Sequence, residues 1–157
     1  MLTNIRFYMA LVLGALAFPI AAADTVGWVE SVSIMPGNRV LEAKLDTGAD
    51  TSSLDARGIE VSQKDGEDWV SFRIGDSDRV EQHKVVRWVG IRGAGGREQR
   101  PVVRLSLCLG NQVYDEEFTL RDRSNMNFSV LLGRSTLEHL PPIDVHKKET
   151  LKPDCKG

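Results

Sequence analysis

The stretch Leu45-Asp46-Thr47-Gly48-Ala49-Asp50-Thr51 decides the fold, because it places a carboxylate on a tight glycine turn directly after an apolar stretch. Residues 40–45 before it have the pattern of a β-strand. Gly48 permits a backbone conformation that a β-carbon forbids, so Asp46 is expected at the strand end, on a turn held by hydrogen bonds from its Thr and Asp neighbours. A carboxylate fixed in this way is suited to acid–base catalysis.

One carboxylate is half of a hydrolytic site. Hydrolysis of an amide by water needs one group to take a proton from the water and another to protonate the carbonyl oxygen. Two facing carboxyl groups that share one proton can do both, since two like charges in contact cannot both ionise. The chain has no second Asp-Thr-Gly or Asp-Ser-Gly. Either a second subunit supplies the partner carboxylate or the motif is not catalytic.

A second segment, residues 128–137, supports the catalytic interpretation. It reads as an apolar strand, then a Gly133-Arg134 turn, then a short helix beginning near Ser135. An acidic turn followed much later by Leu-Leu-Gly-Arg resembles the paired signature of the retroviral-type aspartic proteases. More narrowly, the chain resembles a bacterial retropepsin-like family that has been labelled an ATP-dependent zinc protease and is often encoded beside glutamate ligases of the ATP-grasp type. The resemblance covers residues 26–140.

This resemblance implies an aspartic endopeptidase that acts as a homodimer on a peptide or protein substrate. It implies that Asp50 and Arg134 form an ion pair beneath the turn, in which the guanidinium holds the carboxylate with two parallel hydrogen bonds. The implied site residues fall into three groups: the catalytic turn Asp46, Thr47 and Gly48; the adjoining substrate-binding residues Ala49 and Asp50; and the structural supports Gly133 and Arg134.

Residues 89–98 contain four glycines within seven positions and lie between two β-prone stretches. Such a segment is typical of a mobile hairpin tip. An ordinary flexible loop is the alternative interpretation, and a phosphate-binding loop is disfavoured because no Lys-Ser/Thr follows the glycines. Under the resemblance this hairpin is a flap that closes over substrate, with substrate-binding residues Arg92, Gly93, Ala94, Gly95 and Gly96.

The remaining pattern predicts an all-β domain, a small closed retropepsin-like barrel with one short C-terminal helix. Alternating or apolar runs predict further strands at 26–34, 69–74, 80–89, 102–109 and 112–120. Residues 61–86 have no counterpart in the short retroviral pattern and are expected to form an extra hairpin, which could cover one end of the cleft or add dimer surface.

Residues 1–23 have the pattern of a secretory signal peptide, with Arg6 before an apolar run and three alanines at 21–23 as a cleavage site. An uncleaved anchor helix is the alternative, although the run is short for a membrane span. We therefore expect a protease domain at 24–142, a polar C-terminal extension at 143–157, and a periplasmic or secreted protein without a membrane segment after signal cleavage.

Two cysteines, Cys108 in a predicted strand and Cys155 in the tail, leave two arrangements open. A disulfide would attach the tail to the domain, as an oxidising compartment allows. Alternatively, one thiol is buried and the other is exposed. Sequence gives no distance between them and does not decide.

Charge and histidine content argue against other classes of function. The net charge of −2 disfavours a nucleic-acid partner, and the four arginines at 92, 97, 100 and 104 are expected to be a solvated hairpin face. His83, His139 and His146 do not form a zinc-binding pattern, and no cofactor or metal is expected. The competing function is a non-catalytic peptide-binding module that keeps the barrel but has lost dimerisation.

Overall fold

The structure is a computed structural model that describes residues 24–37, 39–93 and 96–156. The predicted signal segment, residues 1–23, lies outside the described residues. Within them the chain forms eleven strands and one short helix: β1 (Val26–Gly27), β2 (Val29–Met35), β3 (Val40–Leu45), β4 (Ser52–Lys64), β5 (Glu67–Ile74), β6 (Val80–Lys84), β7 (Arg87–Gly93), β8 (Gly96–Leu109), β9 (Gln112–Arg121), β10 (Val130–Leu132), α1 (Arg134–Leu137) and β11 (Ile143–Asp144).

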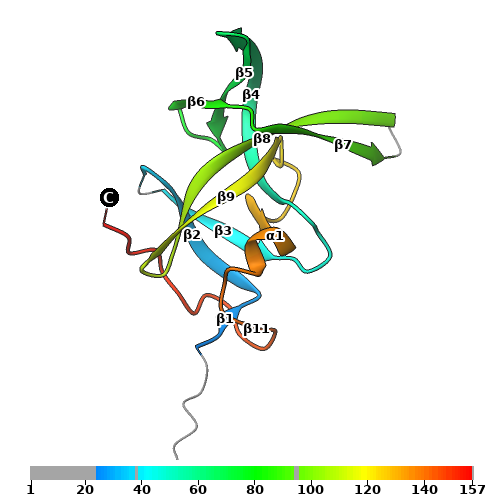
Figure 1. Cartoon of the computed structure of the whole chain (residues 1–157). Helices are drawn as coiled ribbons and strands as arrows, with labels where there is room; N and C mark the ends of the chain where they lie inside the picture. The colour runs from blue at the N-terminus through cyan, green and yellow to red at the C-terminus, as the bar shows by residue number, and fades with distance from the viewer. Residues whose placement is uncertain (1–23, 38, 94–95, 157) are drawn as a thin grey trace, which may run out of the picture.

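Six of these strands form the closed barrel that the sequence predicts. They are hydrogen-bonded in the order β10-β3-β2-β8-β9-β4, and β4 pairs again with β10, so the ring closes (Figure 1). Apolar side chains from around the ring fill its interior; Val32, Leu54, Leu107, Phe118 and Leu132 are all fully buried. In β3 and β10 every second residue is buried, so alternation marks the inward face of these two barrel strands.

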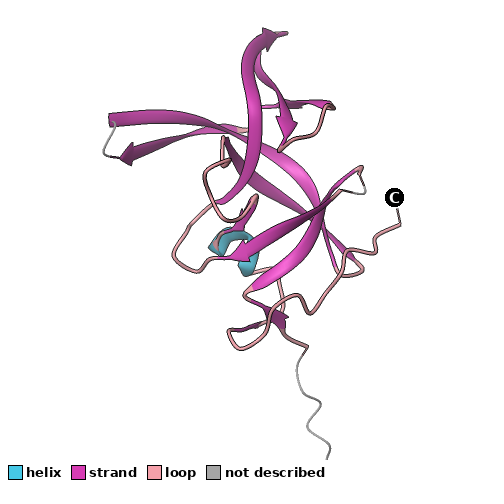
Figure 2. Ribbon diagram, turned by 180° about the vertical axis from the view of Figure 1, so that it is seen from behind, coloured by secondary structure: helices cyan, strands magenta, loops and turns pink. Residues whose placement is uncertain are grey.

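Two protrusions leave the barrel at the same end, as Figures 1 and 2 show. One is the β7–β8 hairpin, paired from Arg87↔Val102 to Gly93↔Gly96. The other, which we call the extension (residues 59–84), consists of the distal half of β4 with β5 and β6. A register shift between Arg57 and Glu60, next to the positive φ of Gly58, marks where β4 leaves the barrel.

The prediction of one strand over 80–89 is wrong. The chain forms β6 beside β5, leaves the sheet at Val85 and Val86, and begins β7 at Arg87. The Val85 N–H donates to Asp68 O in β5, and the Val86 N–H donates to Val102 O in β8. Two consecutive residues are therefore hydrogen-bonded to different strands, one in the extension and one in the barrel. The expected extra hairpin at 61–86 is accordingly a three-stranded element whose first strand continues from the barrel.

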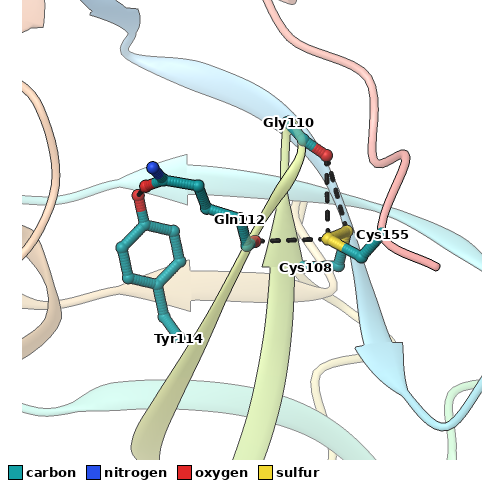
Figure 3. The surroundings of a disulfide bond; sticks show 5 residues. All are labelled: Cys108, Gly110, Gln112, Tyr114 and Cys155. Atoms are coloured by element: carbon teal, nitrogen blue, oxygen red, sulfur yellow. Dashed lines mark hydrogen bonds between the residues drawn. A yellow bond between two sulfur atoms is a disulfide. The ribbon is translucent and has the colours of Figure 1, made fainter. Parts of the chain in front are cut away.

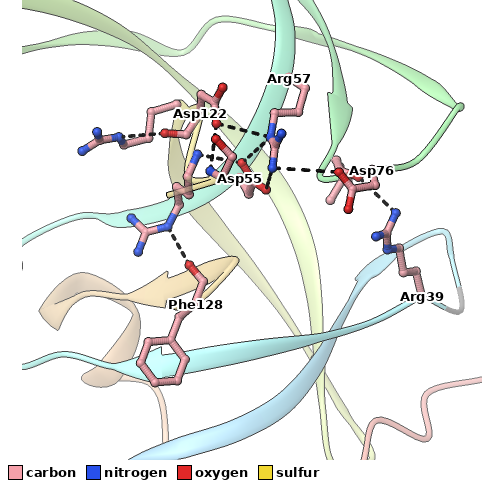
Figure 4. Close-up of polar contacts among 10 residues, drawn as sticks. Arg39, Asp55, Arg57, Asp76, Asp122 and Phe128 are labelled. Atoms are coloured by element: carbon pink, nitrogen blue, oxygen red, sulfur yellow. Dashed lines mark hydrogen bonds and ion pairs between the residues drawn. The ribbon is translucent and has the colours of Figure 1, made fainter. Parts of the chain in front are cut away.

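A cluster of charges stands where the extension meets the barrel (Figure 4). Arg57 holds the buried Asp55 with two hydrogen bonds of 2.9 Å, and the Arg123 N–H donates to the same carboxylate at 2.7 Å. Burial opposes ionisation of Asp55, but Arg57 and the Arg123 amide hold its pKa below the usual range. The cluster therefore fixes the root of the extension with an ion pair whose carboxylate is buried and fully hydrogen-bonded.

The C-terminal tail is bound to the barrel. β11 pairs in parallel with β1, and the buried Glu30 accepts hydrogen bonds from the Thr150 hydroxyl and the Leu151 N–H. A disulfide joins Cys108 to Cys155 with Cα atoms 6.0 Å apart, which settles what the sequence left open (Figure 3). No helix in the described part of the chain is long and apolar enough to span a membrane.

Candidate active site

Asp46 directly follows β3, and its backbone continues the barrel for one more residue. The Asp46 N–H donates to Leu132 O at 2.8 Å, and the Ala49 N–H closes the turn on Asp46 O at 3.2 Å. The side chain is oriented from within the turn, because the Gly48 N–H donates to Asp46 Oδ1 at 3.0 Å. About a quarter of the Asp46 side chain is exposed. The turn thus presents a fixed carboxylate to solvent.

Lys44 contacts this carboxylate, and sequence reasoning missed it. Its Nζ lies 3.1 Å from Asp46 Oδ2, the oxygen that Gly48 does not contact. The Lys44 hydrogen bond is the main reason that the pKa of Asp46 lies below its usual range, with a smaller contribution from the Gly48 N–H. The signal was present in the sequence: residues two apart on a strand face the same side, so a lysine at 44 points where Asp46 points.

The second motif lies beside the first because β10 pairs in parallel with β3, with Leu132 opposite Leu45. Gly133 follows at a position where a β-carbon would lie 2.7 Å from Asp50 O, so no larger residue fits without backbone movement. The Arg134 N–H then donates to Ala49 O at 2.9 Å and the Ser135 N–H to Asp50 O at 3.1 Å. We call residues 45–52 and 130–137, which these bonds hold together, the floor of the site.

Arg134 forms the expected ion pair with Asp50, but with a different geometry. Nη2 donates to Asp50 Oδ1 at 3.1 Å, whereas Nη1 donates to Thr47 O at 3.0 Å. The prediction that Arg134 holds Asp50 with two parallel hydrogen bonds is therefore wrong. The ion pair is also exposed rather than covered by the turn. The guanidinium instead joins the middle of the catalytic turn to its end.

Below the floor runs a chain of buried polar contacts that the sequence did not reveal. Ser52 Oγ accepts the Gly133 N–H at 3.0 Å and contacts Thr136 Oγ1 at 2.7 Å. Thr136 Oγ1 in turn donates to Glu116 Oε2 at 3.2 Å, and Glu116 Oε1 lies 2.7 Å from His139 Nδ1. This chain connects β4, α1 and β9 directly beneath the acidic turn.

The β7–β8 hairpin and the acidic turn face a common cavity of about 410 Å³. Its apolar lining includes Val89 and Ile91 from the hairpin, and its acidic-turn wall is formed by residues 49–51. Four guanidinium groups also line it: Arg87, Arg100, Arg121 and Arg123. Burial lowers the pKa of Arg123. The cavity therefore brings four arginines next to residues 49–51, although Arg87 pairs with Glu117 and Arg100 with Glu98; Asp46 is not among its lining residues.

Of the predicted flap residues, the structure places Arg92 and Gly93 at the end of β7 and Gly96 at the start of β8. Gly96 has a φ of 107°, as the tip of a hairpin requires of a glycine. Ala94 and Gly95 lie outside the described residues. Arg100 and Arg104, which were expected to share one solvated face, lie differently: Arg100 lines the cavity, whereas Arg104 is exposed and pairs with Glu117.

The side chains of His83 and His139 have local structural partners. His83 packs on Phe72 with ring centroids 5.8 Å apart, and burial lowers its pKa. The Glu116 carboxylate raises the pKa of His139, whereas His146 is exposed. In residues 24–37, 39–93 and 96–156, no three His, Cys, Asp or Glu side chains are grouped so that they could hold a metal ion.

Known proteins are similar to this chain over most of its length. A family model described as the retropepsin-like aspartic endopeptidase RimB matches residues 25–154. A protein named probable alpha-L-glutamate ligase from Desulfotalea psychrophila is 38% identical over 109 residues, which are 64% of this chain and 23% of that protein. One with the same name from Shewanella pealeana is 33% identical over 115 residues, 69% of this chain and 25% of that protein. The chain thus spans about a quarter of these relatives.

A solved structure has the same fold. It is a protein of unknown function from Legionella pneumophila, which superimposes with a TM-score of 0.69 at 29% identity and covers 80% of this chain and 96% of its own. Because 96% of that chain is matched, most of the present fold occurs in a second protein at 29% identity.

Proposed function

This chain belongs to the RimB-like family of retropepsin-like aspartic endopeptidases, and we propose that it hydrolyses peptide bonds with a water activated between two Asp46 carboxylates, one from each of two subunits. The observation that best supports this proposal is the position of Asp46 on a turn whose backbone groups are hydrogen-bonded to residues 132–135. A single chain holds one such turn, so the proposed mechanism requires a homodimer.

In the proposed dimer the two Asp46 carboxyl groups share one proton. The ionised one takes a proton from the water, whose oxygen attacks the peptide carbonyl, while the protonated one gives its proton to the carbonyl oxygen. The carboxyl group that took the water proton then gives it to the nitrogen, the C–N bond breaks, and the other carboxylate takes a proton from a diol hydroxyl, so that a carboxylic acid and an amine leave and the dyad again holds one proton. The Gly48 N–H orients each carboxylate, and Thr47 would brace the two turns across the dimer axis.

The substrate would lie extended in the groove and pair with residues 92–96 of the β7–β8 hairpin by strand addition. We propose an acidic substrate, because four guanidinium groups line the cavity beside the turn. The printed name of the relatives, probable alpha-L-glutamate ligase, refers to an acidic amino acid, which supports this proposal. Ligase activity itself is a property of those much longer proteins.

The second candidate function is peptide binding without cleavage. It is favoured by the pairing of Asp46 with Lys44 in the single chain, which stabilises an ionised carboxylate rather than a shared proton. A monomer could capture an acidic peptide in the same cavity. Solution mass therefore separates the two candidates.

We further propose that the protein works in the periplasm or outside the cell. The signal-like pattern of residues 1–23 and the Cys108–Cys155 disulfide support this location.

The decisive variant is Asp46→Asn, compared with Asp65→Asn at the exposed tip of the extension, which removes the same charge. With a fluorogenic Glu-rich peptide as substrate, Asp46→Asn should lose activity about 100- to 10,000-fold without unfolding, and the control should retain it. A hydroxyl-containing transition-state analogue of the pepstatin type should inhibit, and a chelator should not. Full activity in Asp46→Asn, or zinc-restored activity after chelation, would overturn the proposal.

A further inference from the structure

Lys44 is the cation nearest the carboxylate on which the proposed function depends. Its backbone is fixed in the barrel between neighbours on both sides, opposite Val29 on β2 and Leu131 on β10. Its side chain is 38% exposed, and its Nζ lies 3.1 Å from Asp46 Oδ2. The flanking residues Ala43 and Leu45 point into the core. Lys44 therefore lies on the outward face of β3, the face on which its Nζ contacts Asp46.

We infer that Lys44 is a positioning residue that sets the pH range in which the Asp46 pair carries its single shared proton. This inference rests on the proposed function, because it assigns a role within that same pair. Lys44 would act through Asp46 and would take no part in proton transfer itself.

The direction of the effect follows from electrostatics. A cation within hydrogen-bond distance stabilises a carboxylate and lowers its pKa. Two carboxylates that share a proton titrate as a unit with two apparent pKa values, and each Lys44 lowers both. The singly protonated, active form is therefore populated at lower pH than it would be without Lys44. Burial of the pair in a dimer would strengthen the effect, because screening by water falls.

Other charged groups around the turn do not substitute for Lys44. Arg123, in the connection between β9 and β10, contributes a weaker attraction to Asp46. Arg134 from α1 and Asp50 from the turn neutralise each other at 3.1 Å. The contact of β10 with the turn is uncharged, because it consists of the Leu132 carbonyl, which accepts a hydrogen bond from the Asp46 N–H.

The direct test is a titration of the Asp46 side-chain carboxyl carbon by NMR in the parent protein and three variants. In Lys44→Met the Asp46 pKa should rise by about one unit, whereas Lys44→Arg, which keeps the cation, should leave it near the parent value. The matched control is Lys84→Met, since Lys84 is also half-exposed and paired with a carboxylate, Glu67, but lies in the extension. The control should not change the Asp46 pKa.

The kinetic test is the pH profile of kcat/KM on a Glu-rich peptide, whose two limbs report the pair in the free enzyme. Both limbs should move upward by about one pH unit in Lys44→Met and return in Lys44→Arg. If Lys44 merely bound substrate, KM would rise with unmoved limbs; if it were only structural, activity would fall with unmoved limbs. Either result, or an unmoved Asp46 pKa, would overturn the inference.

The two proposals fail in different ways. An active Asp46→Asn would remove the proposed function, whereas an inactive Asp46→Asn with unmoved limbs in Lys44→Met would remove only the role of Lys44. Should Lys44→Met not fold, Lys44→Gln, which is also uncharged and similar in length, makes the same comparison. The NMR titration decides the electrostatic contact even if the isolated protein does not cleave the peptide.

Discussion

The floor of the site and the extension are both β structure joined by one strand, β4, yet they are stabilised in opposite ways. In the floor, backbone groups of the acidic turn, Gly133 and α1 pair with one another, and the hydroxyl of Ser52 fills the remaining gap. In the extension, residues 60–67 are all exposed, and the strands are held chiefly by their ladders and by Val70 and Phe72 at the base.

The difference shows where substitutions should matter. A floor in which buried polar groups satisfy one another tolerates few changes, because each lost partner leaves another group unpaired. An exposed ladder loses little when one side chain changes. Pairs of matched substitutions, one in each region, test this contrast.

The largest difference is expected between two glycines. Gly133→Ala places a β-carbon 2.7 Å from backbone atoms of Asp50 and Thr51, which should reduce the free energy of unfolding by about 3 kcal/mol. Gly66→Ala meets no atom within 4 Å and is opposed only by its φ of 78°, a cost of about 1 kcal/mol. Urea denaturation measures both. Equal losses would contradict the contrast.

Two serines should differ next. Ser52→Ala leaves the Gly133 N–H without its buried acceptor and removes one of the two contacts of the Thr136 hydroxyl, which should cost about 2 kcal/mol. Ser62→Ala, in the exposed part of β4, should change stability by no more than about 0.5 kcal/mol. A Ser52→Ala protein as stable as the parent would show that the buried network contributes little.

Arginine replacement should affect activity more than stability. Arg134→Lys cannot contact Thr47 O and Asp50 together, so stability should fall by about 1 kcal/mol and peptide cleavage by about tenfold as the turn loosens. Arg79→Lys, beside Glu81 in the extension, should leave cleavage unchanged. Parent-level activity in Arg134→Lys would mean that the backbone bonds alone fix the turn.

The smallest effects are expected from the histidines, with opposite signs. Glu116 raises the pKa of His139, so its stabilising contribution is present below the ordinary histidine pKa and is lost as pH rises through the raised value. Burial lowers the pKa of His83, so its contribution is present above the ordinary pKa and is lost as pH falls through the lowered value. Denaturation between pH 5 and 8 measures both effects. Relative to the parent, the stability lost in His139→Gln should shrink as pH rises, whereas the stability lost in His83→Gln should grow.

The barrel and its acidic turn could be predicted because their constraints are local. Asp46, Gly48 and the alternation before them specify a strand followed by a turn, and Leu132-Gly133-Arg134 specifies the segment that fits against it. These requirements are imposed by backbone geometry and leave few residue types at each position.

An extra hairpin at 61–86 could be predicted, but the way in which β4 continues into the extension and the buried network could not. Beyond Ile59, every residue of β4 is exposed, and the alternation of Ile59 and Val61 with polar neighbours is too short to reveal a strand. The break at Val85 and Val86 follows from pairing with two sheets, which is a tertiary effect. The contacts of Ser52, Thr136 and Glu116 span up to 84 residues of sequence, and no local pattern marks them.

The disulfide also determines how the protein behaves when its chain is cut between Cys108 and Cys155. Cys108 and Cys155 close a covalent ring that contains β9, β10 and α1, while Asp46 lies outside it. A cut within the exposed residues 124–127 would leave both pieces joined through sulfur. A molecule nicked there would keep its mass apart from one added water, and a denaturing gel would separate its fragments only after reduction.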